Sequence, residues 1–357
     1  MSASTRRMPF VDTLKAIASQ LIVLHHLAFY GPMSDIAYPL AAGSIDWLYE
    51  YGRMAVQVFL VVAGYLAARS LAPAGIPADI APIRQIWARY CRLALPLFVA
   101  LLLSIISAAI ARQLMDHPSI SAAPTPWQVL SHILLLQNLL DHEALSAGVW
   151  YVAIDFQLFV ILIVSLWFAR KRANPAFMAP FLITVLAAAA LLHFNRQDNW
   201  DNWGLYFFGS YALGIAAAWV GQPRRATGWS LLILSLTVIA LLLDFRLRIG
   251  IALGTALLLV VSGHQKLNAR WPDFRLMAWL GRISYSLFLI HFPVCLLVNA
   301  LMFHFAPHSP ALNLMGMGLA WLLSIGAGAL FYYGIEARIG RLLAGASRST
   351  TKQTGTA

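Results

Sequence analysis

Apolar residues fill most of the chain in long runs that short polar segments separate. An α-helix needs about 20 such residues to cross the hydrocarbon core of a bilayer. Ten runs approach or exceed this length, at 10–30, 47–70, 93–113, 148–170, 176–194, 203–221, 228–244, 247–263, 277–302 and 311–334. The pattern predicts an all-α integral membrane protein with about ten transmembrane helices in one bundle.

Two further segments do not fit the spanning pattern. The apolar run 127–140 is too short to cross a bilayer, so we expect an interfacial or re-entrant segment. Residues 346–357 are small and polar, which is typical of a disordered tail. We therefore expect a single transmembrane domain over 1–345, followed by a disordered cytoplasmic tail over 346–357.

The basic residues indicate the orientation of the predicted bundle. With the N-terminus in the cytoplasm, most of the 25 Lys and Arg residues flank the helices on the inner side, as the positive-inside rule requires. Lys15 lies within the first span, and the residues left outside are Arg53, Arg112, Arg196, Arg246 and Arg248. Both termini are therefore expected in the cytoplasm.

Composition supports the same class and excludes others. The chain is 60% hydrophobic and only 11% charged, whereas soluble domains are nearer a quarter charged. The net charge of +11 follows from the basic inner flanks, so it gives no reason to expect a nucleic-acid partner. The two cysteines, Cys91 and Cys295, are too few for a disulfide framework.

The first predicted span carries more polar side chains than a purely structural helix would tolerate. An ionisable group near the bilayer centre costs several kcal/mol. At about 100° per residue, Lys15 and His26 share one helix face, and His25 points to another. A buried helix with satisfied polar contacts is the alternative, but we favour a functional site.

Polar residues of three other spans fall at a similar predicted depth, in the middle to outer half of the bilayer. These residues are Gln57, Asp155, Gln157 and His291. Intramembrane polar groups usually face a cavity and one another. Two alternatives stay open: Gln57 could join two helices, and His291 could bond a carbonyl freed by Pro293. No spacing among the histidines suggests a metal site.

Three arginines, Arg84, Arg89 and Arg92, precede the third span on the inner side. They could be simple positive-inside flanks. Arginines clustered on a helix also form a plausible site for phosphate groups.

Five ordered motifs resemble the acyltransferase-3 family, bacterial membrane proteins that transfer acyl groups to glycans and other acceptors. FVDTLKAIASQLIVLHH resembles its first helix, with Lys15 at the arginine position and His26 at the histidine position. AVQVFLVVAGYLAARS and VWYVAIDFQLF resemble two further motifs, with Gln57 and Asp155 at the acidic positions. RYCRLALPLF resembles the spaced arginines before a proline, and LGRISYSLFLIHFPV resembles the late helix.

The resemblance implies a stand-alone multi-pass enzyme of the bacterial cytoplasmic (inner) membrane, without a periplasmic hydrolase-like domain. It would transfer an acyl group, most often acetyl, from cytoplasmic acyl-CoA to a hydroxyl of a glycan or other acceptor at the outer half of the bilayer. We expect no bound cofactor and no metal, because acyl-CoA is the donor substrate.

The expected roles divide into three sets. The catalytic set is His26, as general base or acyl carrier, with Asp155 to orient it and His25 as the competing base. The set expected to bind the CoA phosphates is Lys15, Arg84, Arg89 and Arg92. The set expected to line the substrate cavity is Gln57, Trp150, Tyr151, Gln157, Tyr285 and His291.

A proton-coupled secondary transporter or flippase is the alternative, because the same polar groups could form a proton path. The sequence leaves open the acceptor, the acyl group and the oligomeric state.

Overall fold

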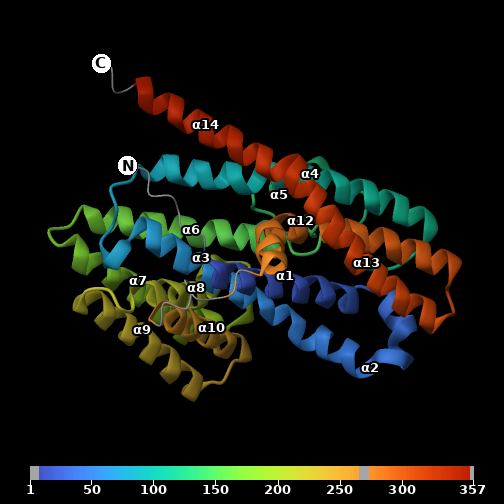
Figure 1. The fold of residues 1–357 in the computed structure, drawn as a ribbon, viewed down its shortest axis with the longest axis horizontal. Coiled ribbons are helices and arrows are strands. Elements are labelled where there is room, and N and C mark those ends of the chain that lie inside the picture. Colours follow the sequence, from blue (N-terminus) through green and yellow to red (C-terminus); the bar gives the residue numbers. More distant parts are fainter. Residues whose placement is uncertain (1–7, 265–271, 273, 354–357) are drawn as a thin grey trace. The chain divides into compact units, whose positions relative to one another are not determined.

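The computed structural model describes residues 8–264, 272 and 274–353, and their side chains except those of 264 and 346–353. Within these residues the fold consists of helices and connecting segments, with no strand (Figure 1). The α-helices are α1 (Pro9–Phe29), α2 (Met33–Tyr51), α3 (Ala55–Leu71), α4 (Pro82–Leu114), α5 (Pro126–Ile133), α6 (Val149–Arg170), α7 (Pro175–Leu192), α8 (Gly204–Trp219), α9 (Arg224–Leu243), α10 (Leu247–His264), α12 (Arg275–Phe305), α13 (Pro310–Phe331) and α14 (Ala337–Gln353). The prediction of an all-α fold is confirmed for the described residues.

The chain divides into two compact units. Of the described residues, unit 1 contains those within 8–18, 54–86 and 153–282, and unit 2 contains those within 19–53, 87–152 and 283–353. Four helices, α1, α4, α6 and α12, contribute residues to both units. Each unit is therefore assembled from segments that are far apart in the sequence.

Seven helical segments of the described residues are long and apolar enough to cross a membrane. They are Met33–Leu71, Pro82–Leu114, Val149–Arg170, Pro175–Arg196, Arg224–Leu243, Arg275–Phe305 and Pro310–Gly345. Every one of the ten predicted spans overlaps a described helix, but α8 and α10 are shorter and α1 is more polar. A multi-pass membrane protein is supported, whereas the count of ten spans and the cytoplasmic termini stay predictions.

Helix α2 was not predicted over most of its length. Asp35, Pro39, Gly43 and Asp46 interrupt the hydrophobic pattern there, so residues 33–46 were expected between two spans. The chain is nevertheless helical from Met33, with a bend at Ala41 two residues after Pro39. A proline removes one helical hydrogen bond and bends a helix without ending it.

Close packing of α3 against α8 organises unit 1. A Cβ atom on Gly64 would collide with the Tyr211 carbonyl, and one on Gly214 would collide with the Val61 carbonyl. Only glycine lets two helix backbones approach this closely, as in the small-residue interfaces of membrane helices. The same interface carries a hydrogen bond from Ser210 Oγ to Gln57 Oε1 of 2.7 Å.

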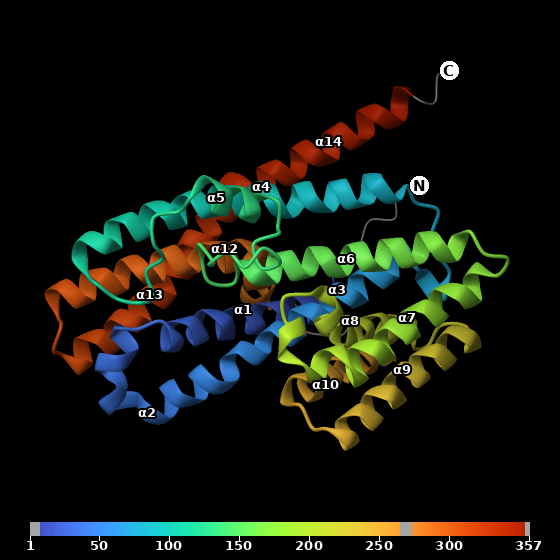
Figure 2. The same ribbon diagram turned by 180° about the vertical axis from the view of Figure 1, so that it is seen from behind.

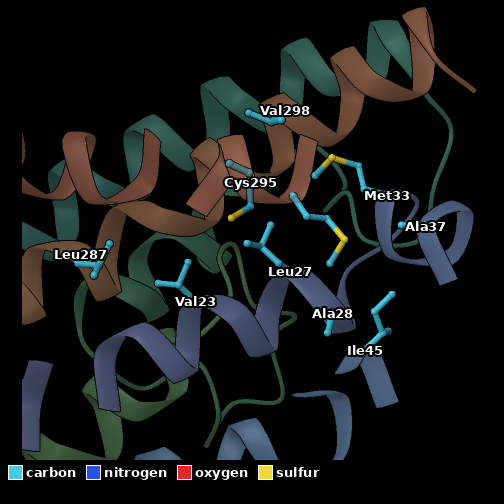
Figure 3. Packing of buried hydrophobic residues seen from close by; sticks show 11 residues of the cluster. Val23, Leu27, Ala28, Met33, Ala37, Ile45, Leu287, Cys295 and Val298 are labelled. Carbon is cyan, nitrogen blue, oxygen red and sulfur yellow. The ribbon is translucent and has the colours of Figure 1, made fainter. Parts of the chain in front are cut away.

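An apolar cluster organises unit 2 (Figure 3). Val23 and Leu27 of α1 pack with Met33 of α2 and with Leu287 and Cys295 of α12. Helix α13 adds Met317 and Ala320 to the same cluster. Figure 2 shows these four helices from the other side. The second half of α1 is thus fixed in a well-packed environment.

The segment between α4 and α6 carries the short helix α5. Thr125 and Gln128 form a reciprocal capping box at its N-terminus, and the helix ends after only two turns. The prediction that this apolar segment forms no spanning helix agrees with this length, and its interfacial location stays a prediction.

Several sequence-based predictions fall partly or wholly outside the described residues. Helix α14 continues to Gln353, but the side chains from 346 onward and residues 354–357 are outside, so the disordered tail stays a prediction. Arg6, Arg7, Lys266 and Arg270, four of the basic residues that we expect on the inner side, also lie outside the described residues.

Candidate active site

His26 of α1 and His291 of α12 form a buried imidazole pair within unit 2. His26 Nδ1 lies 2.6 Å from His291 Nε2, and the ring centroids are 4.9 Å apart. His291 is fully buried and His26 is 8% exposed. Two residues separated by most of the sequence are thereby joined by a direct hydrogen bond.

The surrounding residues explain why these two histidines meet. The His26 ring contacts the edge of Tyr30, and Tyr30 contacts Phe292 beside His291. Asn299, one turn further along α12 from Cys295, donates hydrogen bonds to the Tyr30 and Cys295 carbonyls and accepts one from the Met33 N–H. The polar clamp formed by Asn299 ties the end of α1 to α12. Sequence reasoning missed Asn299, and its position on the face of His291 and Cys295, eight and four residues earlier, was the available signal.

His25 has a different environment from His26. Its Nδ1 lies 2.9 Å from the Leu48 carbonyl of α2. Its Cβ packs so closely against Gly52 that a Cβ added at position 52 would collide with it. His25 therefore fastens α1 to the end of α2. The structure separates the two neighbouring histidines by partner: a backbone carbonyl for His25 and another imidazole for His26.

His291 does not bond the carbonyl that Pro293 frees. Because proline lacks an N–H, the carbonyl four residues earlier, that of Leu289, loses its helical donor. His291 Nδ1 instead lies 3.1 Å from the Leu287 carbonyl and 2.9 Å from the Phe288 carbonyl. The alternative that His291 bonds a carbonyl freed by Pro293 is therefore wrong.

Lys15 and Asp155 belong to unit 1, whereas His26 and His291 belong to unit 2. Lys15 Nζ forms an ion pair of 3.2 Å with Asp12 Oδ1, one turn earlier on α1. Asp155 of α6 is 4% exposed. The predicted action of Asp155 on His26 joins residues of two units and stays a prediction.

The three arginines lie near the start of α4. Arg84, in unit 1, and Arg92, in unit 2, are exposed, whereas Arg89 is half-buried. The same part of the helix is held in unit 2 by the Tyr285 hydroxyl, which donates to the Leu93 carbonyl at 2.9 Å. The Tyr285 side chain, predicted to line a cavity, thus also joins α12 to α4.

The other predicted cavity residues have identified partners. Gln57 accepts from Ser210, and Gln157 accepts from the Gly204 N–H at 2.7 Å, at the first residue of α8. In unit 2 the Trp150 and Tyr151 rings meet edge to face. Tyr151 also packs edge to face against Phe288, which precedes His291 by one helical turn. The two glutamines therefore hold helices of unit 1, while Tyr151 lies beside the imidazole pair's own helix.

The chain offers no obvious metal-binding site in the part that the structure describes. No group of three or more His, Cys, Asp or Glu side chains among those residues has an arrangement that could hold an ion. An imidazole pair in a buried setting can instead accept and donate protons. General acid–base chemistry is the chemistry that this arrangement offers.

Comparison with known proteins gives the family context. A family model described as an acyltransferase domain, Acyl_transf_3, matches residues 8–333. This range includes every residue that the sequence motifs single out, from Lys15 to His291. No solved structure matches.

Among individual proteins, the O-acetyltransferase OatA of Staphylococcus aureus is 22% identical over 335 residues, covering 83% of this chain and 52% of OatA. A Bacillus subtilis protein provisionally named as a peptidoglycan O-acetyltransferase, YrhL, is 23% identical, covering 82% of this chain and 49% of YrhL. The chain spans about half the length of these two relatives. The protein called Regulator of hypoxia-inducible factor 1 from Caenorhabditis elegans is 23% identical over 96% of this chain and 81% of that protein.

Proposed function

Because the chain belongs to the acyltransferase-3 family, we propose that it is a membrane-embedded O-acyltransferase. The observation that carries the proposal is the pairing of His26 with His291 inside the family match. His26 is the family-motif histidine of α1, and it lies buried in hydrogen-bond contact with a second imidazole. A site of this kind suits proton transfer during attack of a hydroxyl on an acyl group.

We propose acetyl-CoA as the donor and a carbohydrate hydroxyl as the acceptor. The names of OatA and YrhL, which refer to O-acetyltransfer, favour acetyl, and that of YrhL favours a peptidoglycan sugar. His26 takes the hydroxyl proton while the oxygen attacks the thioester carbonyl. The carbon–sulfur bond then breaks, and the proton passes from His26 to the departing CoA sulfur. The products are the O-acetylated sugar and free CoA.

The remaining roles rest on the sequence motifs. Lys15, Arg84, Arg89 and Arg92 are proposed to bind the CoA phosphates on the cytoplasmic side, where positive charge attracts the donor. Asp155, at the acidic position of its motif, is proposed to orient His26 and to stabilise its protonated form. The enzyme is proposed to act in the bacterial inner membrane.

The proposal is tested by acetyl transfer in the purified full chain. Labelled acetyl-CoA is supplied with soluble peptidoglycan fragments, and in parallel with an oligosaccharide of another class. His26→Ala should lower transfer by at least about 100-fold, the usual contribution of a general base. His25→Ala should reduce it much less, because His25 bonds the Leu48 carbonyl and fastens two helices.

The outcomes separate the candidate functions. If folded His25→Ala loses transfer by about 100-fold while His26→Ala retains it, the base is His25 and the proposed assignment to His26 is wrong. If the wild-type protein consumes no acetyl-CoA with any acceptor but carries an oligosaccharide across a liposome membrane, the transporter alternative replaces the enzyme.

A further inference from the structure

The hydrogen-bond partners of His291 fix the position of its proton. Its Nδ1 faces the carbonyl oxygens of Leu287 and Phe288, at 3.1 and 2.9 Å. A carbonyl oxygen can only accept a hydrogen bond, so Nδ1 must carry the hydrogen. A neutral imidazole has one N–H and one lone pair. The other nitrogen of His291, Nε2, therefore presents a lone pair.

That lone pair in turn fixes the proton of His26. His26 Nδ1 lies 2.6 Å from His291 Nε2, and one of the two nitrogens must donate. Because His291 Nε2 is the acceptor, the hydrogen lies on His26 Nδ1. The backbone of α12 thus sets the direction of the whole chain of bonds, from His26 to His291 to two carbonyls.

The ring geometry fits a bond directed along the lone pair. The two ring planes are within 9° of parallel, and the centroids are 4.9 Å apart. This centroid distance exceeds the nitrogen–nitrogen distance of 2.6 Å by the radii of the two rings, so the rings meet edge to edge in nearly one plane. A hydrogen bond to an imidazole nitrogen is strongest in that plane.

We propose that His291 is a positioning residue that holds His26 as the Nδ1-protonated tautomer, so that Nε2 of His26 is the atom that takes the acceptor proton. Within unit 2, no described side chain or carbonyl forms a hydrogen bond with that Nε2. His291 occupies the place at Nδ1 that a carboxylate holds in a Ser-His-Asp triad. This inference rests on the proposed acyltransferase function for its kinetic consequence, but not for the tautomer itself.

The role differs from that of a residue that lines a cavity. When Nε2 of His26 accepts a proton, the ring becomes cationic, and its Nδ1–H bonds more strongly to His291. His291 can support this charge because its own N–H points at two carbonyl dipoles. Loss of the acceptor at Nδ1 should therefore impair the chemical step more than substrate binding.

Two substitutions of His291 separate these effects. His291→Gln places a carboxamide near the former Nε2 and can still accept from His26 Nδ1, whereas His291→Leu cannot. We expect His291→Leu to lower kcat about 10- to 100-fold, as for other groups that orient an imidazole, with little change in KM. His291→Gln should recover most of that loss. His308→Leu, the same change at an exposed histidine after α12, is the matched control.

A spectroscopic measurement tests the tautomer without relying on activity. Full-length protein labelled with ¹⁵N-histidine in lipid nanodiscs should show His26 protonated at Nδ1, with its signals assigned by their loss in His26→Gln. His291→Leu should convert His26 to a mixture of tautomers, and His291→Gln should preserve the original one.

The two failures are distinguishable. If wild-type protein transfers no acetyl group but His26 has the expected tautomer, the proposed function fails and the positioning role of His291 stands. An Nε2-protonated His26 in wild-type protein overturns that positioning role, as does a folded His291→Leu variant with unchanged kcat. If His291→Leu does not fold, the wild-type tautomer and the His291→Gln kinetics still decide the question.

Discussion

Three polar side chains of unit 1, two buried and one half-buried, end their hydrogen bonds differently from the His26–His291 pair of unit 2. In unit 1, Gln57 accepts from Ser210, Gln157 accepts from the first residue of α8, and Asn195 bonds with Arg246, Arg248 and the Tyr206 carbonyl. In unit 2, the His26–His291 chain runs from two carbonyls to an imidazole whose second nitrogen makes no bond within the unit.

The difference teaches which intramembrane polar groups carry chemistry. An amide that donates and accepts within its own surroundings lowers the cost of burial and holds helices together. An imidazole with one nitrogen fixed and the other uncommitted can still gain or lose a proton. Substitutions at the α3–α8 contact of unit 1, where the polar groups are paired, should therefore change stability without changing kcat, and the following predictions test that distinction.

The largest effect is expected where α3 meets α8 in unit 1. In Gly214→Ala the new Cβ collides with the Val61 carbonyl, and backbone cannot move without separating the helices. Such overpacking should cost about 3 kcal/mol of unfolding free energy. Denaturant unfolding of the purified protein in detergent measures this loss.

The matched control is Gly228→Ala in α9, where a Cβ has no heavy atom within 4 Å. Replacing this helical glycine should leave stability unchanged or raise it by about 0.5–1 kcal/mol. The folded fraction of Gly214→Ala should keep the wild-type kcat. A lowered kcat in that folded fraction would remove the distinction between the two units.

An intermediate effect is expected from His132, a structural histidine of unit 2. Its Nδ1 bonds the Gln128 carbonyl at 2.7 Å, and its Nε2 accepts from the Leu145 N–H at 3.1 Å. Burial lowers the pKa of His132, partly offset by the bond to Gln128 and reinforced by nearby His142. Protonation would place a hydrogen on Nε2 against the Leu145 N–H, so the charged form opposes this fold.

The sign of the pH effect follows from the lowered pKa. His132 contributes stability above about pH 6.5, its usual unfolded value, and this contribution is lost as pH falls through the folded-state pKa. After correction for its intrinsic exchange rate, the Leu145 amide hydrogen of the wild-type protein should be less protected from exchange at pH 5 than at pH 7. His132→Asn should abolish the pH difference. Equal protection at both pH values would contradict the assignment.

The sequence predicted the helices better than it predicted the partners of polar groups. Hydrophobic runs are local, so each of the ten expected spans overlaps a helix, while α2 was missed because Pro39 and two acidic residues interrupt its pattern. His26 and Gln57 could be singled out by the cost of burying them. Their partners, His291 and Ser210, are separated from them by 265 and 153 residues. Only packing brings such residues together.

The smallest effect, and the sharpest test of Gln57, comes from its bond to Ser210. Both side chains are buried. Ser210→Ala removes the donor to Gln57 Oε1, and Gln57→Leu removes the acceptor of the Ser210 hydroxyl, so either change alone leaves one polar group at the α3–α8 interface without this partner. Each single substitution should cost about 1–2 kcal/mol of unfolding free energy. The double variant should cost less than the sum of the two, because no unpaired polar atom is left behind.

Kinetics then decide between the structural role of Gln57 and the role expected from its motif position. If Gln57 only joins α3 to α8, the Gln57→Leu/Ser210→Ala protein should show wild-type kcat and KM for acetyl transfer, once corrected for folded protein. Ser210→Ala alone is the control, since it breaks the same bond and leaves the Gln57 side chain in place. A raised KM for the acceptor in both Gln57→Leu variants, but not in Ser210→Ala, would instead place Gln57 in substrate binding. In that case a satisfied hydrogen bond would no longer identify a purely structural residue in this fold.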